Sequence, residues 1–67
     1  MLLRLSGYGL LHRQVYTALR LKVLTGEIPA SARLPSTRVL ALDNGISRMT
    51  AELAYDQLAA EGYIETR

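Results

Sequence analysis

The sequence predicts a mainly α-helical domain that contains three helices followed by one short strand. Two observations lead to this fold class. Long runs without glycine or proline carry apolar residues at intervals of three and four, which is the spacing of one helix face. Serines and glycines stand at the boundaries of these runs, where helices begin and end. The predicted domain covers residues 10–67, and residues 1–9 form an N-terminal extension.

The first predicted helix covers residues 10–25 and ends at Gly26, which suits the left-handed conformation of a helix cap. Residues 27–33 have no helical period and predict a loop, with Ile28 and Leu34 as its apolar anchors. The apolar face of the helix is marked by Leu11, Val15, Ala18, Leu19 and Val23.

The second and third helices are predicted at residues 36–44 and 47–61. Each range begins with a serine, Ser36 or Ser47, whose hydroxyl can accept a hydrogen bond from an amide of the first turn. Gly45 lies in the short connection between them. Two helices joined by a short glycine-containing turn are typical of a helix-turn-helix, whose second helix can enter the major groove of DNA. The apolar stripe of the third helix consists of Ala51, Ala54, Tyr55 and Leu58.

Residues 63–67 follow Gly62 and are rich in aromatic and β-branched types, which predicts a short strand. The sequence stops before a second strand that could pair with it. An unfinished strand leaves backbone groups unpaired, so we expect the chain to be a fragment of a longer protein.

Composition excludes several classes of function. The chain has 67 residues, of which 49% are hydrophobic and 21% charged, and it contains no cysteine. This balance excludes a disordered tail, and the short apolar runs exclude a membrane span. His12 is the sole histidine and is expected at the surface, so a zinc site cannot be assembled. The first residues lack the long apolar segment of a secretory signal, which favours a cytoplasmic location.

Motifs of catalysis are incomplete. The segment GISRM at residues 45–49 begins like the nucleophile elbow of hydrolases but ends in methionine where glycine is required. GYG at residues 7–9 is followed by His12 at the position of the third glycine of a dinucleotide-binding motif. We therefore expect no enzyme activity, and no catalytic residue, metal or cofactor in this chain.

Charge is distributed unevenly along the chain. Residues 1–33 hold five basic residues and one acidic residue, whereas residues 34–67 hold three basic and five acidic residues. The formal net charge of +2 therefore does not by itself identify a nucleic-acid-binding protein.

The first turns of the second and third helices carry side chains suited to DNA. Arg48 can form a bidentate hydrogen bond with guanine, Met49 can contact a thymine methyl group, and Arg38 can hold the phosphate backbone. Hydroxyl groups beside them can bond to phosphate or base. The predicted DNA contacts are Ser36, Thr37, Arg38, Ser47, Arg48, Met49 and Thr50.

Two features weigh against this hypothesis. Glu52, Asp56 and Glu61 outnumber Arg48 on the third helix, so only its tip is expected to approach DNA, and the carboxylates form a solvated face. The alternative function is a helical module for protein association or dimerisation without DNA binding. Its second apolar surface would comprise Tyr16, Leu21, Leu24 and Leu53.

Ordered motifs over residues 10–67 resemble the winged-helix DNA-binding domain of GntR-family bacterial transcription regulators. The motifs are RLPSTR at 33–38, GISR at 45–48 and AYDQLAAEGY at 54–63. The last of these is similar to the MocR branch of the family. Asn44 departs from the pattern, which usually has an apolar residue there, so we expect a lost core contact.

This resemblance implies a three-helix winged helix-turn-helix domain with a truncated wing strand, and double-stranded DNA as its partner. It also implies that Arg38 and residues 47–50 contact DNA. Homodimer contacts and effector binding are expected mainly in a C-terminal region that this sequence lacks. In the MocR branch that region is an aminotransferase-like domain that binds pyridoxal phosphate.

Overall fold

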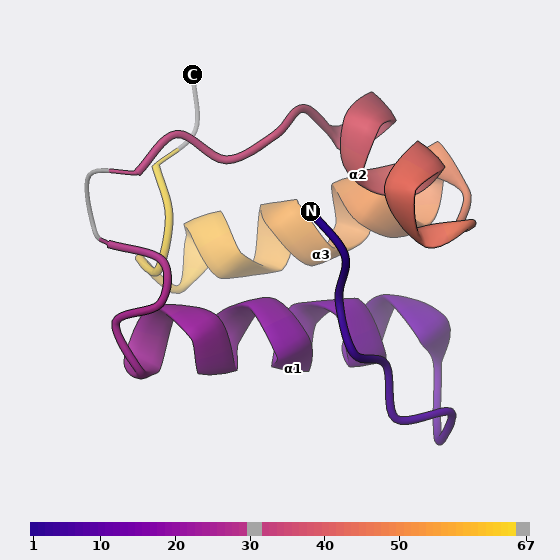
Figure 1. Cartoon of the computed structure of the whole chain (residues 1–67), viewed down its shortest axis with the longest axis horizontal. Helices are drawn as coiled ribbons and strands as arrows, with labels where there is room; N and C mark the ends of the chain where they lie inside the picture. The colour runs from indigo at the N-terminus through magenta and orange to yellow at the C-terminus, as the bar shows by residue number, and fades with distance from the viewer. Residues whose placement is uncertain (30–31, 66–67) are drawn as a thin grey trace.

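The computed structural model describes residues 1–29 and 32–65, and within them it contains three helices (Figure 1). Helix α3 packs against both other helices, and in Figure 1 it lies alongside α1 and runs in the same direction. The mainly α-helical, three-helix fold is confirmed. The helices are α1 (Leu11–Leu24), α2 (Thr37–Asn44) and α3 (Arg48–Ala60).

Serine side chains begin both helices of the helix-turn-helix. The Val39 amide donates to the Ser36 hydroxyl over 3.1 Å, and the Thr50 amide donates to the Ser47 hydroxyl over 3.0 Å. Each bond satisfies an amide that the helix itself leaves free, and such a cap stabilises a helix by about 1 kcal/mol. The two predicted N-caps are therefore confirmed. Helix α1 begins after Leu10 without a side-chain cap.

Glycines end the same two helices. Gly45 adopts a φ of 63° after α2, and Gly62 adopts a φ of 81° after α3, a region that favours glycine. After α3 the Gly62 amide donates to the Ala59 carbonyl and the Tyr63 amide donates to the Leu58 carbonyl, which is the Schellman arrangement.

The prediction of a strand at residues 63–67 is wrong for the residues that the structure describes. Residues 63–65 form a bend and irregular backbone instead, and residues 66 and 67 lie outside the described part of the chain. The Tyr63 amide is already used by the cap, and Tyr63 and Ile64 pack their side chains against the core. A strand also needs a neighbouring strand to accept its amides, and the described residues provide none.

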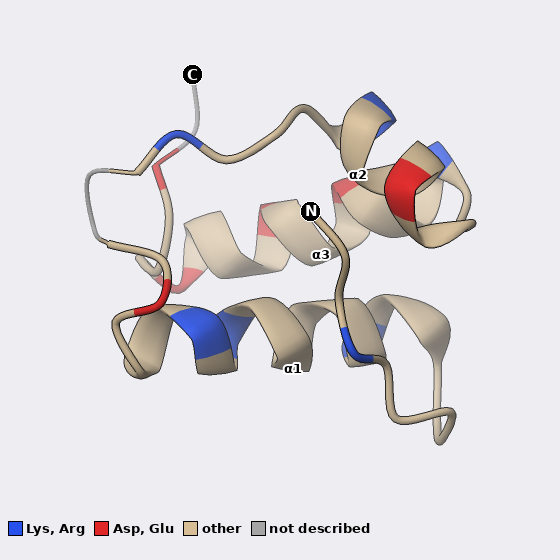
Figure 2. Cartoon of the chain, in the orientation of Figure 1, with Lys and Arg blue, Asp and Glu red and all other residues tan. Residues whose placement is uncertain are grey.

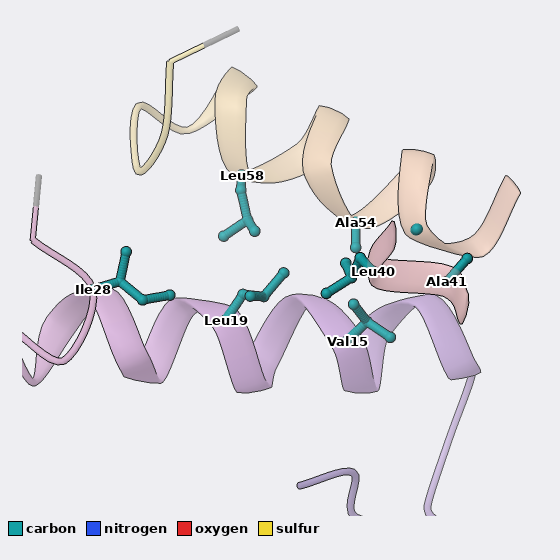
Figure 3. Close-up of a cluster of buried hydrophobic side chains, with 8 residues drawn as sticks. Val15, Leu19, Ile28, Leu40, Ala41, Ala54 and Leu58 are labelled. Atoms are coloured by element: carbon teal, nitrogen blue, oxygen red, sulfur yellow. The ribbon is translucent and has the colours of Figure 1, made fainter. Parts of the chain in front are cut away.

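The core lies where the three helices meet (Figure 3). Small side chains on α3, Ala51 and Ala54, are fully buried, which allows the neighbouring helices to approach closely. Leu40 extends from α2 toward Val15 of α1. Leu11, predicted on the apolar face of α1, is 41% exposed. The buried hydrophobic residues of the described chain are Val15, Leu19, Ile28, Leu40, Ala41, Ala51, Ala54 and Leu58.

The N-terminal segment is attached to the end of α2 through Asn44. The Leu3 amide donates to Asn44 Oδ1 over 2.8 Å, and Asn44 Nδ2 donates to the carbonyls of Met1 at 2.8 Å and Leu40 at 2.9 Å. The Met1 ammonium group also pairs with Asp43. The departure from the usual apolar residue at position 44 therefore adds three hydrogen bonds, two of them to the N-terminal segment.

We expect Asn44→Ala to lower the free energy of unfolding by about 1–3 kcal/mol, because partly buried backbone groups lose their partners. Urea unfolding followed by circular dichroism measures this change. Gln14→Ala is a matched control, since Gln14 also bonds the N-terminal segment, to Gly7 and Gly9, but at exposed positions. Its effect is expected to stay below about 0.5 kcal/mol. Equal losses in the two variants would contradict the special role of Asn44.

Polar contacts join α1 to the end of α3. Tyr16 donates to the Glu61 carboxylate, and this bond together with one from Gln57 lowers the pKa of Glu61. Arg20 Nε donates to the Tyr63 hydroxyl over 3.0 Å, and its guanidinium lies 5.4 Å from the centre of the Tyr63 ring. These contacts join α1 to the C-terminal end of α3 outside the buried core.

Candidate nucleic-acid interface

The starts of α2 and α3 lie at the same end of the domain, and each carries a basic residue (Figure 2). These residues are Arg38 in the first turn of α2 and Arg48 at the first position of α3. Acidic residues occur farther along α3 (Figure 2). The basic residues of α2 and α3 thus lie at the tip of the helix-turn-helix, and an acidic residue of α2 lies at the same end (Figure 2).

The packing of α2 against α3 fixes the distance between these two starts. Ala41 of α2 and Ala51 of α3 are buried, so the helices meet through small side chains. Ile46, in the turn, packs against the core, and its amide donates to the Ala41 carbonyl over 3.1 Å. The turn is therefore held from both sides, and the first turn of α3 has a defined direction.

Tyr55 provides a second connection between the two helices. Its hydroxyl donates to the Pro35 carbonyl over 2.7 Å, and burial raises the pKa of Tyr55 to about 12. Pro35 immediately precedes the cap residue of α2, so this bond attaches the start of α2 to the middle of α3. A groove lies beside it, lined by the loop before α2, by Ser36 and Thr37, and by side chains of α3 and the C-terminal segment.

The seven predicted DNA contacts all lie at these two helix starts. Thr37 and Thr50 are half-buried, and the remaining five are exposed. The Ser47 and Thr50 hydroxyls are 2.8 Å apart and bond to each other, so part of their hydrogen-bonding capacity is used within the helix. Met49 is 71% exposed. Arg38, Arg48 and Met49 are all exposed at this end of the domain.

Glu52 is exposed, as predicted for the solvated face of α3. Its Oε1 also lies 3.0 Å from Arg48 Nε, in an ion pair that the sequence analysis did not predict. The spacing of four along a helix was the available signal. The side chains of Arg48 and Glu52 are 69% and 50% exposed, so the pair contributes little to stability.

Other kinds of site are lacking in the described residues. Within residues 1–29 and 32–65, no group of three histidine, cysteine, aspartate or glutamate residues could hold a metal ion. No helix in the same part of the chain is long and apolar enough to cross a membrane.

The chain matches a known protein family over almost its whole length. The family model described as "Bacterial regulatory proteins, gntR family" matches residues 2–67. The chain belongs to the GntR family. The GntR match includes residues 2–9, which the sequence alone had placed outside the domain, and in the structure Leu3 and Leu5 pack against its core. Membership in a family of regulatory proteins also confirms that this GntR domain is not an enzyme.

Curated relatives with similar sequences are also transcriptional regulators or regulatory proteins. The chain is 51% identical over 57 residues to the "Probable rhizopine catabolism regulatory protein MocR" of Rhizobium meliloti, covering 85% of this chain and 12% of the relative. It is 36% identical over 62 residues to the "HTH-type transcriptional regulator TauR" of Rhodobacter capsulatus, covering 92% of this chain and 13% of the relative. It is 42% identical over 53 residues to the "HTH-type pyridoxine biosynthesis transcriptional regulator PdxR" of Corynebacterium glutamicum, covering 79% and 12%.

This GntR chain thus spans about one eighth of the length of these curated relatives. No solved structure matches it significantly. As the helix-turn-helix domain of a GntR-family bacterial regulator, this chain is a DNA-binding domain. Its similarity to MocR agrees with the resemblance to the MocR branch that the sequence motifs indicated.

Proposed function

We propose that the domain binds double-stranded DNA in a sequence-specific manner, with the first turn of α3 in the major groove. The observation that carries this proposal is the position of the two helix starts. They lie at one end of the domain, carry Arg38 and Arg48 at exposed positions, and are held together by buried small residues. A regulator that acts on bacterial chromosomal DNA would do so in the cytoplasm.

Each helix start contributes a different kind of contact. Arg48 offers terminal guanidinium nitrogens to guanine O6 and N7, and Met49 offers an apolar surface to a thymine methyl group. Arg38, one helix away, lies where it can bind the phosphate backbone and fix the register. The free amides in the first turn of α3 also favour phosphate oxygens. Base contacts would therefore come from α3 and backbone contacts mainly from α2.

The acidic residues of α3 limit how the helix can approach DNA. Glu52 and Asp56 are exposed, and Glu61 is exposed at its C-terminal end. Carboxylates close to phosphates repel them, so a helix lying along the groove would be disfavoured. An approach by the tip alone keeps Arg48 nearest to the bases and Glu61 farthest from the backbone.

The proposal also covers dimer formation and cofactor binding by the whole protein. By similarity to the MocR branch, two copies would bind related half-sites through dimer contacts outside this chain. By the same similarity, pyridoxal phosphate would be bound by an aminotransferase-like domain outside this chain.

The test is a titration of the chain against a pool of randomised DNA duplexes at low and moderate salt, with sequencing of the retained DNA. Enrichment of a short motif, with binding that weakens steeply as salt rises, is the expected result. Leu21, Leu24 and Leu53 are exposed, which favours the alternative function of an association module. Self-association that is insensitive to salt, without DNA retention, would support that alternative instead.

Arg38→Ala is expected to weaken binding to all duplexes alike and to reduce the slope of log affinity against log salt by about 1. The reason is the loss of one phosphate contact without the loss of a base contact. Fluorescence anisotropy with the selected duplex and an unrelated duplex, each over a range of salt, measures both quantities. Arg38→Lys is the matched control, because it keeps the charge and should keep most of the slope. A loss restricted to the selected duplex would contradict the assignment of Arg38 to the backbone.

A further inference from the structure

We propose that Glu52 determines base specificity together with Arg48, and that the pair recognises a cytosine beside the guanine read by Arg48. This inference rests on the proposed function, since it names a further residue of the same DNA interface. It assigns a role to a side chain whose negative charge is otherwise unfavourable beside DNA.

The first step is the location of Glu52 on α3. Ala51, Ala54 and Leu58 are buried and define the core-facing side of the helix. Glu52 does not belong to that side. Together with Asp56 it lines the same groove as Ser36 and Thr37 at the start of α2. Glu52 therefore lies on the side of α3 that faces the start of α2, beside two of the proposed DNA contacts, Ser36 and Thr37.

The second step is the contact between the two side chains. Glu52 Oε1 lies 3.0 Å from Arg48 Nε, so the carboxylate holds one edge of the guanidinium group. Within the described residues, the terminal nitrogens of Arg48 make no hydrogen bond. They remain available for a bidentate bond with guanine O6 and N7. Glu52 thus orients the guanidinium group of Arg48.

The third step is the chemistry of the neighbouring base. An ionised carboxylate only accepts hydrogen bonds. In the major groove guanine presents two acceptors and thymine presents one, so both repel Glu52. Adenine has a donor, but its N7 acceptor lies next to it. Cytosine presents its N4 amino group and has no major-groove acceptor of its own, and it is the base that glutamate recognises through its major-groove edge.

The fourth step concerns affinity for unrelated DNA. A carboxylate at the interface weakens every complex in which it has no donor, because phosphates dominate affinity without regard to sequence. It weakens the correct complex least, since there the carboxylate keeps its ion pair with Arg48 and accepts a hydrogen bond from the cytosine amino group. Glu52 would therefore act as a residue that disfavours the wrong sequences.

The experiment compares Glu52→Ala with Asp56→Ala in the 67-residue chain, by titration against the randomised duplex pool. Asp56 is the matched control because it is an exposed carboxylate one turn farther along the same side of α3. We expect Glu52→Ala to bind unrelated DNA several-fold more tightly. We also expect it to lose at least fivefold of the preference for cytosine next to the guanine position. Asp56→Ala should raise affinity for all duplexes slightly and leave the base preference unchanged.

The outcomes separate this inference from the proposed function. A wild-type motif that Glu52→Ala leaves unchanged would overturn the role of Glu52 while DNA binding stands. If both variants changed the affinity equally and left the base preference unchanged, Glu52 would act only through its negative charge, and the inference would be overturned as well. No binding of the wild-type chain even at low salt would overturn both proposals. Circular dichroism of each variant checks that the helices are intact.

Discussion

Leu40→Ala is expected to lower the free energy of unfolding by about 2–5 kcal/mol, which would leave a large fraction of the chain unfolded. Leu40 is 0% exposed and is the one large α2 side chain in the core of the described residues, with only Ala41 beside it. It fills the space between α2 and α1, near Val15 (Figure 3). A domain of this size buries a limited core, so one cavity removes a large share of its stability.

Urea and thermal unfolding, followed by circular dichroism, measure the loss in Leu40→Ala. Leu42→Ala is the matched control, because the same chemical change is made two residues away on α2, at a side chain that is 73% exposed. We expect that variant to change the free energy of unfolding by less than about 0.5 kcal/mol. Similar losses at both positions would show that the helix propensity of α2, rather than its burial in the core, decides the stability.

Arg48→Ala is expected to weaken binding to the selected duplex by about 1–3 kcal/mol and to remove the preference for guanine at one position. Arg48 is the only basic residue in the first turn of α3, and its side chain is 69% exposed. Its ion pair with Glu52 is solvated, so its removal should leave the fold intact. Anisotropy titrations with the selected duplex and with duplexes mutated at each position measure the effect.

The control for Arg48→Ala is Arg13→Ala. Arg13 is an exposed arginine of α1, outside the helix-turn-helix, so its removal changes the net charge by the same amount. We expect a small loss that is the same for all duplexes. If both variants reduced the affinity equally and kept the same motif, long-range charge alone would account for binding, and base recognition by Arg48 would be excluded.

Local chemistry made the helix ends predictable. Ser36 and Ser47 supply the caps that their positions indicated, and Gly45 ends α2 in the left-handed conformation. A cap bond joins residues three apart in the chain, so it can be recognised in a short stretch of sequence. The strand prediction for residues 63–67 failed at 63–65 for the opposite reason. A strand requires a partner that is distant in the sequence, and the amide of Tyr63 closes the end of α3 instead.

The residues of the candidate interface differ in the same respect. Its seven predicted DNA contacts could be chosen from the sequence because they lie at the starts of helices. The contacts of Asn44 and Glu52 instead depend on residues that tertiary packing brings near them. Asn44 was expected to weaken the core, but it binds the backbone of Met1 and Leu3, more than forty residues away. Glu52 had a recognisable spacing from Arg48, yet only the packing of α3 shows that it faces the groove beside α2.

By itself the sequence determined the helices, their caps and the short turn, because these depend on hydrogen bonds and side-chain spacing within a few residues. The tertiary structure alone decided which residues of the stripes are buried, where residues 1–9 lie and which carboxylate of α3 meets Arg48. These features result from packing between segments that are far apart in the chain, and the burial and charge of each side chain are set only when those segments meet.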